Sequence, residues 1–110
     1  MKKVLFVCTQ NRLRSPTAEK IFSNYDGIKV KSAGLDPHAR THLTLEMIKW
    51  ADIIFAMEKS HQEKIKKKYQ KNLKGKKLIC LNIPDEYDYM QTELIEVLNE
   101  KVPKHLKVNK

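Results

Sequence analysis

Four short apolar runs, each separated from the next by a stretch with helical periodicity, limit the folds that this chain can adopt. The runs are Lys2–Cys8, Ile28–Ser32, Asp52–Met57 and Leu78–Leu81. Runs of this length are typical of strands, and those without polar alternation are typical of strands buried on both faces. Strands that alternate with helices pair in parallel through right-handed crossovers. We therefore predict an α/β fold, a three-layer α/β/α sandwich around a four-stranded parallel sheet.

The stretches between these runs predict the helices. Ser15 and Pro16 are typical of a helix start, with Ser15 as the cap and Pro16 at the first helical position. We expect further helices after Thr41, from Glu58 to about Leu73, and around residues 94–102.

A chain of 110 residues has room for one domain, and we expect a single domain over residues 1–110, without repeats or linkers. Hydrophobic residues make up 41% of the chain and charged residues 32%, which excludes a disordered tail. No stretch approaches the roughly 20 apolar residues of a membrane helix, and the first apolar run is shorter than a signal-peptide core. With two cysteines and no disulfide framework, we expect a cytoplasmic protein that does not contact membranes.

The formal net charge of +9 favours anionic partners such as nucleic acid, anionic lipid or phosphorylated substrates. Much of this charge lies in the segment Lys64–Lys77. We interpret the segment as a solvated helix face followed by a turn at Gly75. A nucleic-acid site is the less favoured interpretation, because no RNA-recognition signature or paired-cysteine finger accompanies the lysines.

The loop after the first strand carries the chemistry that the sequence indicates. Cys8 ends the strand, five residues follow, and Arg14 and Ser15 lead into the predicted helix. Five residues can form a tight loop whose backbone N–H groups converge on a phosphate-sized anion at a helix N-terminus. Arg14 adds a planar, two-pronged contact to phosphate oxygens. The candidate phosphate-binding residues are Thr9, Gln10, Asn11, Arg12, Leu13, Arg14 and Ser15.

Cys8 is the candidate nucleophile of this loop. A thiol attacks only as the thiolate, so the site must stabilise negative charge on the sulfur. A helix dipole alone contributes about 0.3–2 kcal/mol, and the remainder must come from loop N–H groups, Arg14 and the Ser15 hydroxyl. A lone cysteine at a strand end is more often a small buried hydrophobe. The strand before this motif and the helix after it nevertheless favour the functional interpretation.

The segment VLFVCTQNRLRSPTAEKIF resembles the opening of the low-molecular-weight protein tyrosine phosphatases, whose loop reads C-x-G-N-x-C-R-S-P-x-A-E. The matching residues are Cys8, Asn11, Arg14, Ser15, Pro16, Ala18 and Glu19, followed by Ser32, Ala33 and Gly34. The resemblance implies the strand order 2-1-3-4 with the phosphate loop after the first strand. It also implies that Cys8 forms a phosphocysteine, which water then hydrolyses without a cofactor. Asn11, Ser15 and Ser32 would support the loop, with Asn11 in a left-handed conformation.

The general acid of that family is an aspartate in a D-P-[YFW] loop after the fourth strand, where this chain has Asp85, Glu86 and Tyr87. The resemblance implies that Asp85 protonates the leaving oxygen and then activates water, with Asp88 as the competing candidate. Alternatively these acids cap the last helix, an explanation that suits Asp88 better than Asp85. Tyr87 and Arg12 would form walls beside the substrate.

Three loop positions depart from the family pattern. Gln10 replaces a glycine, so the backbone there must suit a side chain. Arg12 adds a cation beside the phosphate and is expected to favour substrates that are more anionic than a phosphotyrosine peptide. Leu13 replaces a second cysteine, so the protective disulfide of many members should be absent, and Cys80 is expected to be inert core.

The histidines predict no metal centre. His38 and His42 lie four residues apart, but no third ligand has suitable spacing, so we expect no metal. His61 is expected at the surface.

Together these features predict a cysteine-dependent phosphomonoesterase that acts as a monomer on phosphotyrosine or a related aryl phosphate. Two alternatives stay open. An arsenate reductase would need further cysteines to relay a disulfide, and Cys80 is the one candidate. A non-catalytic module would bind phosphoprotein or RNA through the loop and Lys64–Lys77, although binding alone requires neither Cys8 nor Asp85.

Overall fold

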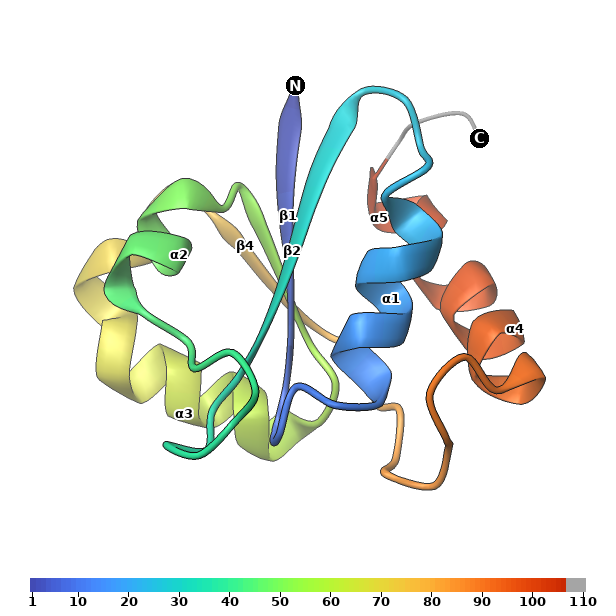
Figure 1. Cartoon of the computed structure of the whole chain (residues 1–110). Coiled ribbons are helices and arrows are strands. Elements are labelled where there is room, and N and C mark those ends of the chain that lie inside the picture. Colours follow the sequence, from blue (N-terminus) through green and yellow to red (C-terminus); the bar gives the residue numbers. More distant parts are fainter. Residues whose placement is uncertain (107–110) are drawn as a thin grey trace.

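A computed structural model of the chain describes residues 1–106 and shows a parallel sheet with helices on both faces (Figure 1). The strands are β1 (Lys2–Cys8), β2 (Ile28–Gly34), β3 (Ile53–Ala56) and β4 (Lys77–Cys80). They lie in the order β2-β1-β3-β4, and all neighbouring strands pair in parallel. The predicted α/β architecture and strand order are confirmed.

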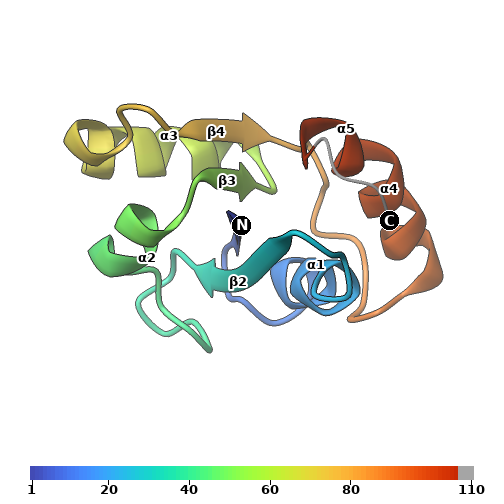
Figure 2. The ribbon, with the colours of Figure 1, turned by 90° about the horizontal axis from the view of Figure 1, so that it is seen from above.

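The helices form one layer on each face of the sheet (Figure 2). One layer contains α1 (Arg14–Phe22), α4 (Thr92–Lys101) and α5 (Pro103–Leu106). The other contains α2 (Leu45–Trp50) and α3 (Lys59–Tyr69). The helix expected to extend to about Leu73 ends earlier, because the chain tightens after α3 into the 3-10 helix η1 (Gln70–Asn72). Within residues 1–106, no helix has the length and apolar character needed to cross a membrane.

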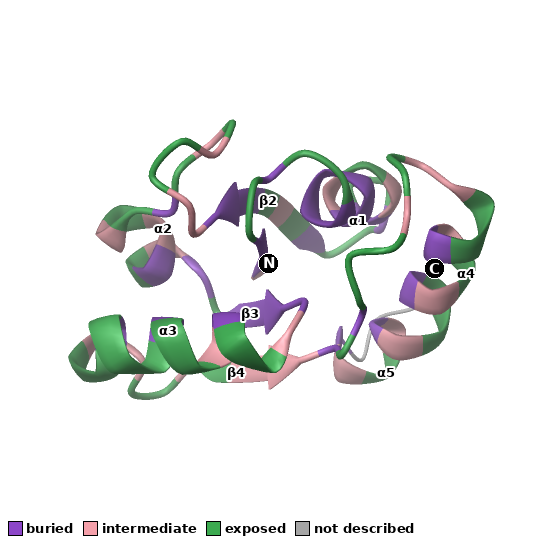
Figure 3. Cartoon of the chain, turned by 90° about the horizontal axis from the view of Figure 1, so that it is seen from below, coloured by how far each residue is buried: buried purple, intermediate pink, exposed green. Residues whose placement is uncertain are grey.

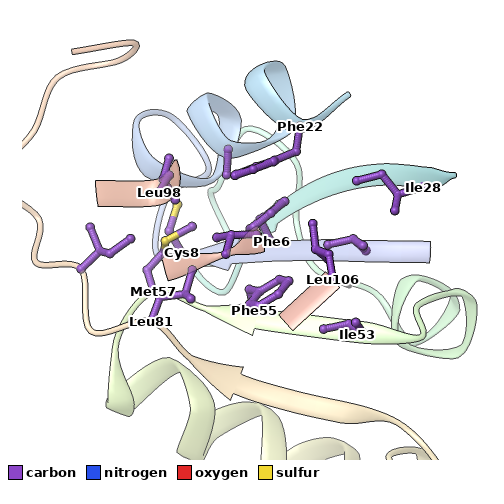
Figure 4. Packing of buried hydrophobic residues seen from close by; sticks show 14 of the residues in the cluster. Phe6, Cys8, Phe22, Ile28, Ile53, Phe55, Met57, Leu81, Leu98 and Leu106 are labelled. Carbon is purple, nitrogen blue, oxygen red and sulfur yellow. The ribbon is translucent and has the colours of Figure 1, made fainter. Parts of the chain in front are cut away.

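The first strand supplies side chains to both halves of the core. Successive side chains of a strand point to opposite faces of the sheet, so Phe6 and Leu5 enter different layers. The Phe6 ring stacks on Phe55 and Phe22, with centroid distances of 5.2 and 5.7 Å (Figure 4). Leu5 packs in the second cluster, which includes Ile65 of α3. Burial on both faces explains why the run lacks polar alternation.

The start of α1 differs from the prediction. The helix begins at Arg14 with Leu13 at the N-cap, so the expected cap at Ser15 is wrong. The Ser15 hydroxyl lies inside the first turn, 2.9 Å from the Cys8 Sγ and 2.8 Å from the Asn11 Nδ2. Because these partners occupy the hydroxyl, it does not accept from the backbone as a capping group would.

Parallel strands end at a common edge of the sheet, which Figure 3 shows from below. At this edge the segment after β2 packs directly on the loop after β1. Gly34 permits the approach, because a Cβ at this position would lie 2.6 Å from both the Ala39 Cβ and the Thr9 carbonyl oxygen. Contacts this short force a neighbouring backbone to move.

We predict that Gly34→Ala lowers the free energy of unfolding by about 1–3 kcal/mol, because the added methyl group overpacks a site bounded by backbone. Urea unfolding followed by circular dichroism measures the change. The double variant Gly34→Ala/Ala39→Gly removes the contact with Ala39 and keeps the contact with Thr9, so its stability should recover only in part. Full recovery would contradict the backbone constraint.

Candidate active site

A small cavity of about 180 Å³ lies at the carboxyl edge of the sheet. Its lining brings together most of the residues that the sequence singled out: Cys8, Thr9, Gln10, Arg12, Leu13, Arg14 and Asp85. Asn11 and Ser15 are fully buried and do not line it. Neither Tyr87 nor Asp88 lines the cavity. The Tyr87 side chain packs against the core cluster instead.

The loop after β1 is tied down through its carbonyl oxygens. The carbonyls of residues 8–11 accept hydrogen bonds from the backbone N–H groups of Leu35, Asp36 and Arg40, each at 3.0 Å, and from the Arg40 Nε at 3.1 Å. By contrast, no hydrogen bond within residues 1–106 is donated by the backbone N–H groups of residues 10–13. Carbonyls that are bound on one side leave the N–H groups available to an oxyanion on the other.

A chain of polar side chains runs beneath the cavity to the sulfur. The Glu19 carboxylate can only accept, so the Ser32 hydroxyl donates to it and accepts in turn from the Asn11 Nδ2 at 2.9 Å. The second proton of that amide goes to the Ser15 Oγ at 2.8 Å. The Ser15 hydroxyl proton is thereby directed at the Cys8 Sγ, 2.9 Å away. A donor held toward the sulfur stabilises the thiolate.

The backbone of this loop suits the residues it carries. Asn11 adopts the left-handed conformation that we expected, with φ of 54°. Asparagine tolerates that region better than most residues, and its buried side chain makes the two contacts described above. Gln10 is outside the positive-φ positions, so its side chain fits without strain and donates to Asp36 Oδ2 at 2.9 Å.

Arg14 is buried and held by two acceptors. Its Nη1 donates to the Glu58 Oε2 at 2.6 Å and to the Ile83 carbonyl at 2.7 Å. Its Nε lies 3.8 Å from the Asp85 Oδ1, a carboxylate whose side chain is 64% exposed. A buried guanidinium needs such partners. Arg14 also lines the cavity.

His61 is buried with 4% exposure, so the prediction of a surface position was wrong. Its Nδ1 accepts from the Glu58 backbone N–H at 3.2 Å, which requires the neutral ring to carry its proton on Nε2. The Nε2 donates to the Thr9 Oγ1 at 2.8 Å and so binds α3 to the loop. Burial, and next the charge of Arg14, lower the pKa of His61 below its usual range. The ring is therefore neutral at pH 7.

Glu19, Glu58 and His61 received no role from the sequence, although their spacing carries a signal. Glu58 and His61 are three residues apart, the separation of a capping box at the start of a helix. Ser15 and Glu19 are four residues apart and share one face of α1. The acids after β4 do not cap the last helix, because Gln91 occupies the N-cap of α4.

The fold and the cavity define a class of α/β proteins in which a cysteine lies inside a strand–loop–helix unit suited to an oxyanion. The family model for low molecular weight phosphotyrosine protein phosphatase matches residues 3–49. The Escherichia coli (strain K12) low molecular weight protein-tyrosine-phosphatase Etp is 35% identical over 82 residues, which cover 53% of this chain and 55% of Etp. The aligned chain thus spans little more than half of that relative.

Two further comparisons agree. A protein-arginine-phosphatase of Geobacillus stearothermophilus is 30% identical over 91 residues, covering 61% of this chain and 62% of the relative. The structure of a YwlE mutant from Bacillus subtilis matches with a TM-score of 0.75 at 27% identity, covering 97% of this chain and 99% of that one. Over residues 3–49 and in its fold, the chain is thus similar to the low molecular weight phosphotyrosine protein phosphatases.

The lowered pKa of His61 predicts a loss of stability in mild acid. The unfolded chain binds a proton at its ordinary pKa of about 6.5 while the folded chain resists it. This contribution is therefore complete above pH 6.5 and decreases as the pH falls below that value. The melting temperature of the wild type should fall more between pH 7.5 and 5.5 than that of His61→Gln. The exposed His38→Gln variant should behave as the wild type does, and equal losses in all three would refute the assignment.

Proposed function

We propose that the chain is a cysteine-dependent phosphomonoesterase that removes phosphate from tyrosine side chains of proteins. The observation that carries this proposal is the convergence of Cys8, Arg14 and Asp85 on one small cavity. Its wall is a loop whose N–H groups at residues 10–13 have no partner within the described part of the chain. A nucleophile, a cationic clamp, an acid and free amide donors are what phosphoryl transfer requires.

The reaction proceeds in two displacements. In the first, the Cys8 sulfur attacks phosphorus, the bond to the tyrosine oxygen breaks, and Asp85 gives its proton to that oxygen. In the second, the Asp85 carboxylate takes a proton from water, the water oxygen attacks phosphorus, and the sulfur–phosphorus bond breaks to release inorganic phosphate. In both steps the loop N–H groups and Arg14 stabilise charge on the phosphoryl oxygens.

Asp85 is a better candidate for the acid than Asp88. Asp85 lines the cavity and lies 3.8 Å from the Nε of Arg14, so its carboxyl group is close to the bound phosphoryl group. The Asp88 backbone participates in the turn before α4, where its N–H donates to Gln91 Oε1 at 2.8 Å. The exposure of Asp85 allows water to reach it for the second step.

Arg12 favours phosphotyrosine over phosphoarginine as the substrate. It is exposed and lines the cavity at its entrance, where the substrate side chain must pass. A guanidinium beside an aromatic ring is attracted to the ring face. The guanidinium of phosphoarginine would place a second positive charge beside Arg12, and the repulsion between the two charges disfavours binding.

The alternative of an arsenate reductase is not supported, because Cys80 is too far from Cys8. Cys80 pairs with Ala56 of β3, and Ala56 pairs with Val7 of β1, so two strand spacings separate the cysteines. Two spacings amount to roughly 10 Å, whereas disulfide Cα atoms lie within about 7 Å of each other. A disulfide relay between them would require the sheet to open.

We further propose that the enzyme acts as a monomer in the cytoplasm. The candidate nucleophile, arginine and acid all lie in this one cavity. Cys8 and Cys80 are both free cysteines, and a reducing compartment keeps the nucleophile in that state.

Cys8→Ser should abolish turnover of p-nitrophenyl phosphate, because no other nucleophile lines the cavity at that position. Asp85→Asn should slow phenyl phosphate hydrolysis by about 10²- to 10⁴-fold and p-nitrophenyl phosphate hydrolysis less, since a good leaving group needs less protonation. Rapid-quench kinetics that follow the phosphocysteine burst measure both effects.

The matched control is Asp88→Asn, which should retain both activities within about twofold because Asp88 does not reach the cavity. Hydrolysis by Cys8→Ser at the wild-type rate would rule out the mechanism. If Asp88→Asn shows the leaving-group dependence and Asp85→Asn does not, the assignment of the acid is wrong. A phosphotyrosine peptide and a phosphoarginine peptide of the same sequence test the substrate class.

A further inference from the structure

A second, larger cavity of about 700 Å³ adjoins the first, between α3 and the segment that follows β2. The two cavities share Thr9, and Glu58 and His61, which hold Arg14 and Thr9, form part of the second one. Its volume lies within the range of about 300–1,000 Å³ that is typical of ligand sites. The space is thus larger than a phosphate group needs and opens next to where that group would bind.

The lining of the second cavity combines an apolar part with a row of cations. Leu35 and Pro37 contribute apolar surface from the segment after β2. Lys64, Lys67 and Lys68 lie at positions i, i+3 and i+4 of α3, so they share one face of the helix. Figure 3 shows that α3 is largely exposed on this side of the molecule.

Lys64, Lys67 and Lys68 form no ion pair in the part of the chain that the structure describes. The acids in the lining are already engaged. Asp36 accepts from the His38 backbone at 2.7 Å and from Gln10 at 2.9 Å, and Glu58 pairs with Arg14 at 2.6 Å. Among the salt bridges of residues 1–106, none includes a lysine. Three exposed ammonium groups therefore line a cavity and are free to pair with anionic groups of a ligand.

We propose that this cavity binds the acidic segment that flanks the phosphorylated residue of a protein substrate. The proposal rests on the phosphatase function and deepens it. Carboxylates next to the phosphorylated residue meet Lys64, Lys67 and Lys68, and an apolar neighbour packs on Leu35 and Pro37. Such contacts give specificity and faster association rather than a large gain in affinity.

The lining favours a peptide over RNA. Single-stranded nucleic acid binds through aromatic side chains on which bases stack. Tyr69 is the one Phe, Tyr or Trp side chain in this lining, and with 7% exposure it presents no open face; the exposed imidazole of His42 is a smaller ring. A peptide needs no stacking platform, since its carboxylates and apolar side chains match the cations and the apolar surface.

The test compares two phosphotyrosine peptides of equal length, one with glutamates and one with glutamines beside the phosphotyrosine. The wild type should prefer the acidic peptide in kcat/KM by about five- to tenfold, the effect of a few partly exposed ion pairs. In Lys64→Gln/Lys67→Gln this ratio should fall to about one. The control Lys66→Gln/Lys71→Gln also removes two positive charges from the segment Lys64–Lys77, but neither residue lines the cavity. This control should keep the wild-type ratio of the two kcat/KM values. Equal ratios in both double variants would overturn the proposal, because the overall field would then be responsible.

A binding measurement separates this proposal from the catalytic one. Fluorescence anisotropy of the acidic phosphopeptide is measured with Cys8→Ser, alone and combined with each double substitution. The cavity is supported if Lys64→Gln/Lys67→Gln weakens binding and the control does not, even where no protein hydrolyses the peptide. An oligoribonucleotide that binds more tightly than the peptide, and loses binding in Lys64→Gln/Lys67→Gln, would overturn the proposal in favour of RNA.

Discussion

The hydrogen bonds that hold the carbonyls of residues 8–11 are the constraint on which the rest of the site depends. These carbonyls are bound by Leu35, Asp36 and Arg40, which follow directly after β2. The loop after β1 is therefore shaped by a segment far away in the sequence, brought close because β1 and β2 are neighbours. Gly34 makes this approach sterically possible. The anion site therefore depends on the loop after β1, on the segment after β2 and on the pairing of these two strands.

Buried polar groups extend this rigidity from the loop into the helices. Glu19 and Ser32 orient Asn11, whose amide orients the Ser15 hydroxyl toward the sulfur. On the opposite side, His61 joins the loop to α3 through Thr9, while Glu58 fixes Arg14. Both protons of the Asn11 amide are used, while its buried Oδ1 has no hydrogen-bond partner within the described residues. Hydrogen bonds of this kind favour one geometry of the network. The donors around the cavity are thus preorganised before any substrate binds.

The fold was predictable because its signals are local and agree with each other. Continuous apolar runs predict buried strands, and the turns at Gly27 and Gly75 have the positive φ values that glycine permits. The start of α1 was missed because a serine before a proline is a strong local cap signal, whereas here tertiary contacts to Cys8 and Asn11 take its hydroxyl. The burial of His61 was also missed, since its partner Thr9 is 52 residues away in the sequence. Polar contacts between residues far apart in the chain are difficult to predict from a single sequence.

The central claim is that the backbone N–H groups of residues 10–13 bind one oxyanion together. An amide-resolved NMR titration with inorganic phosphate measures this most directly. We expect the amide resonances of these residues to shift together along a single saturating curve, with Arg14 Nε following the same curve. Resonances that stayed in place while the amides of residues 64–77 shifted would contradict a shared oxyanion site in the loop.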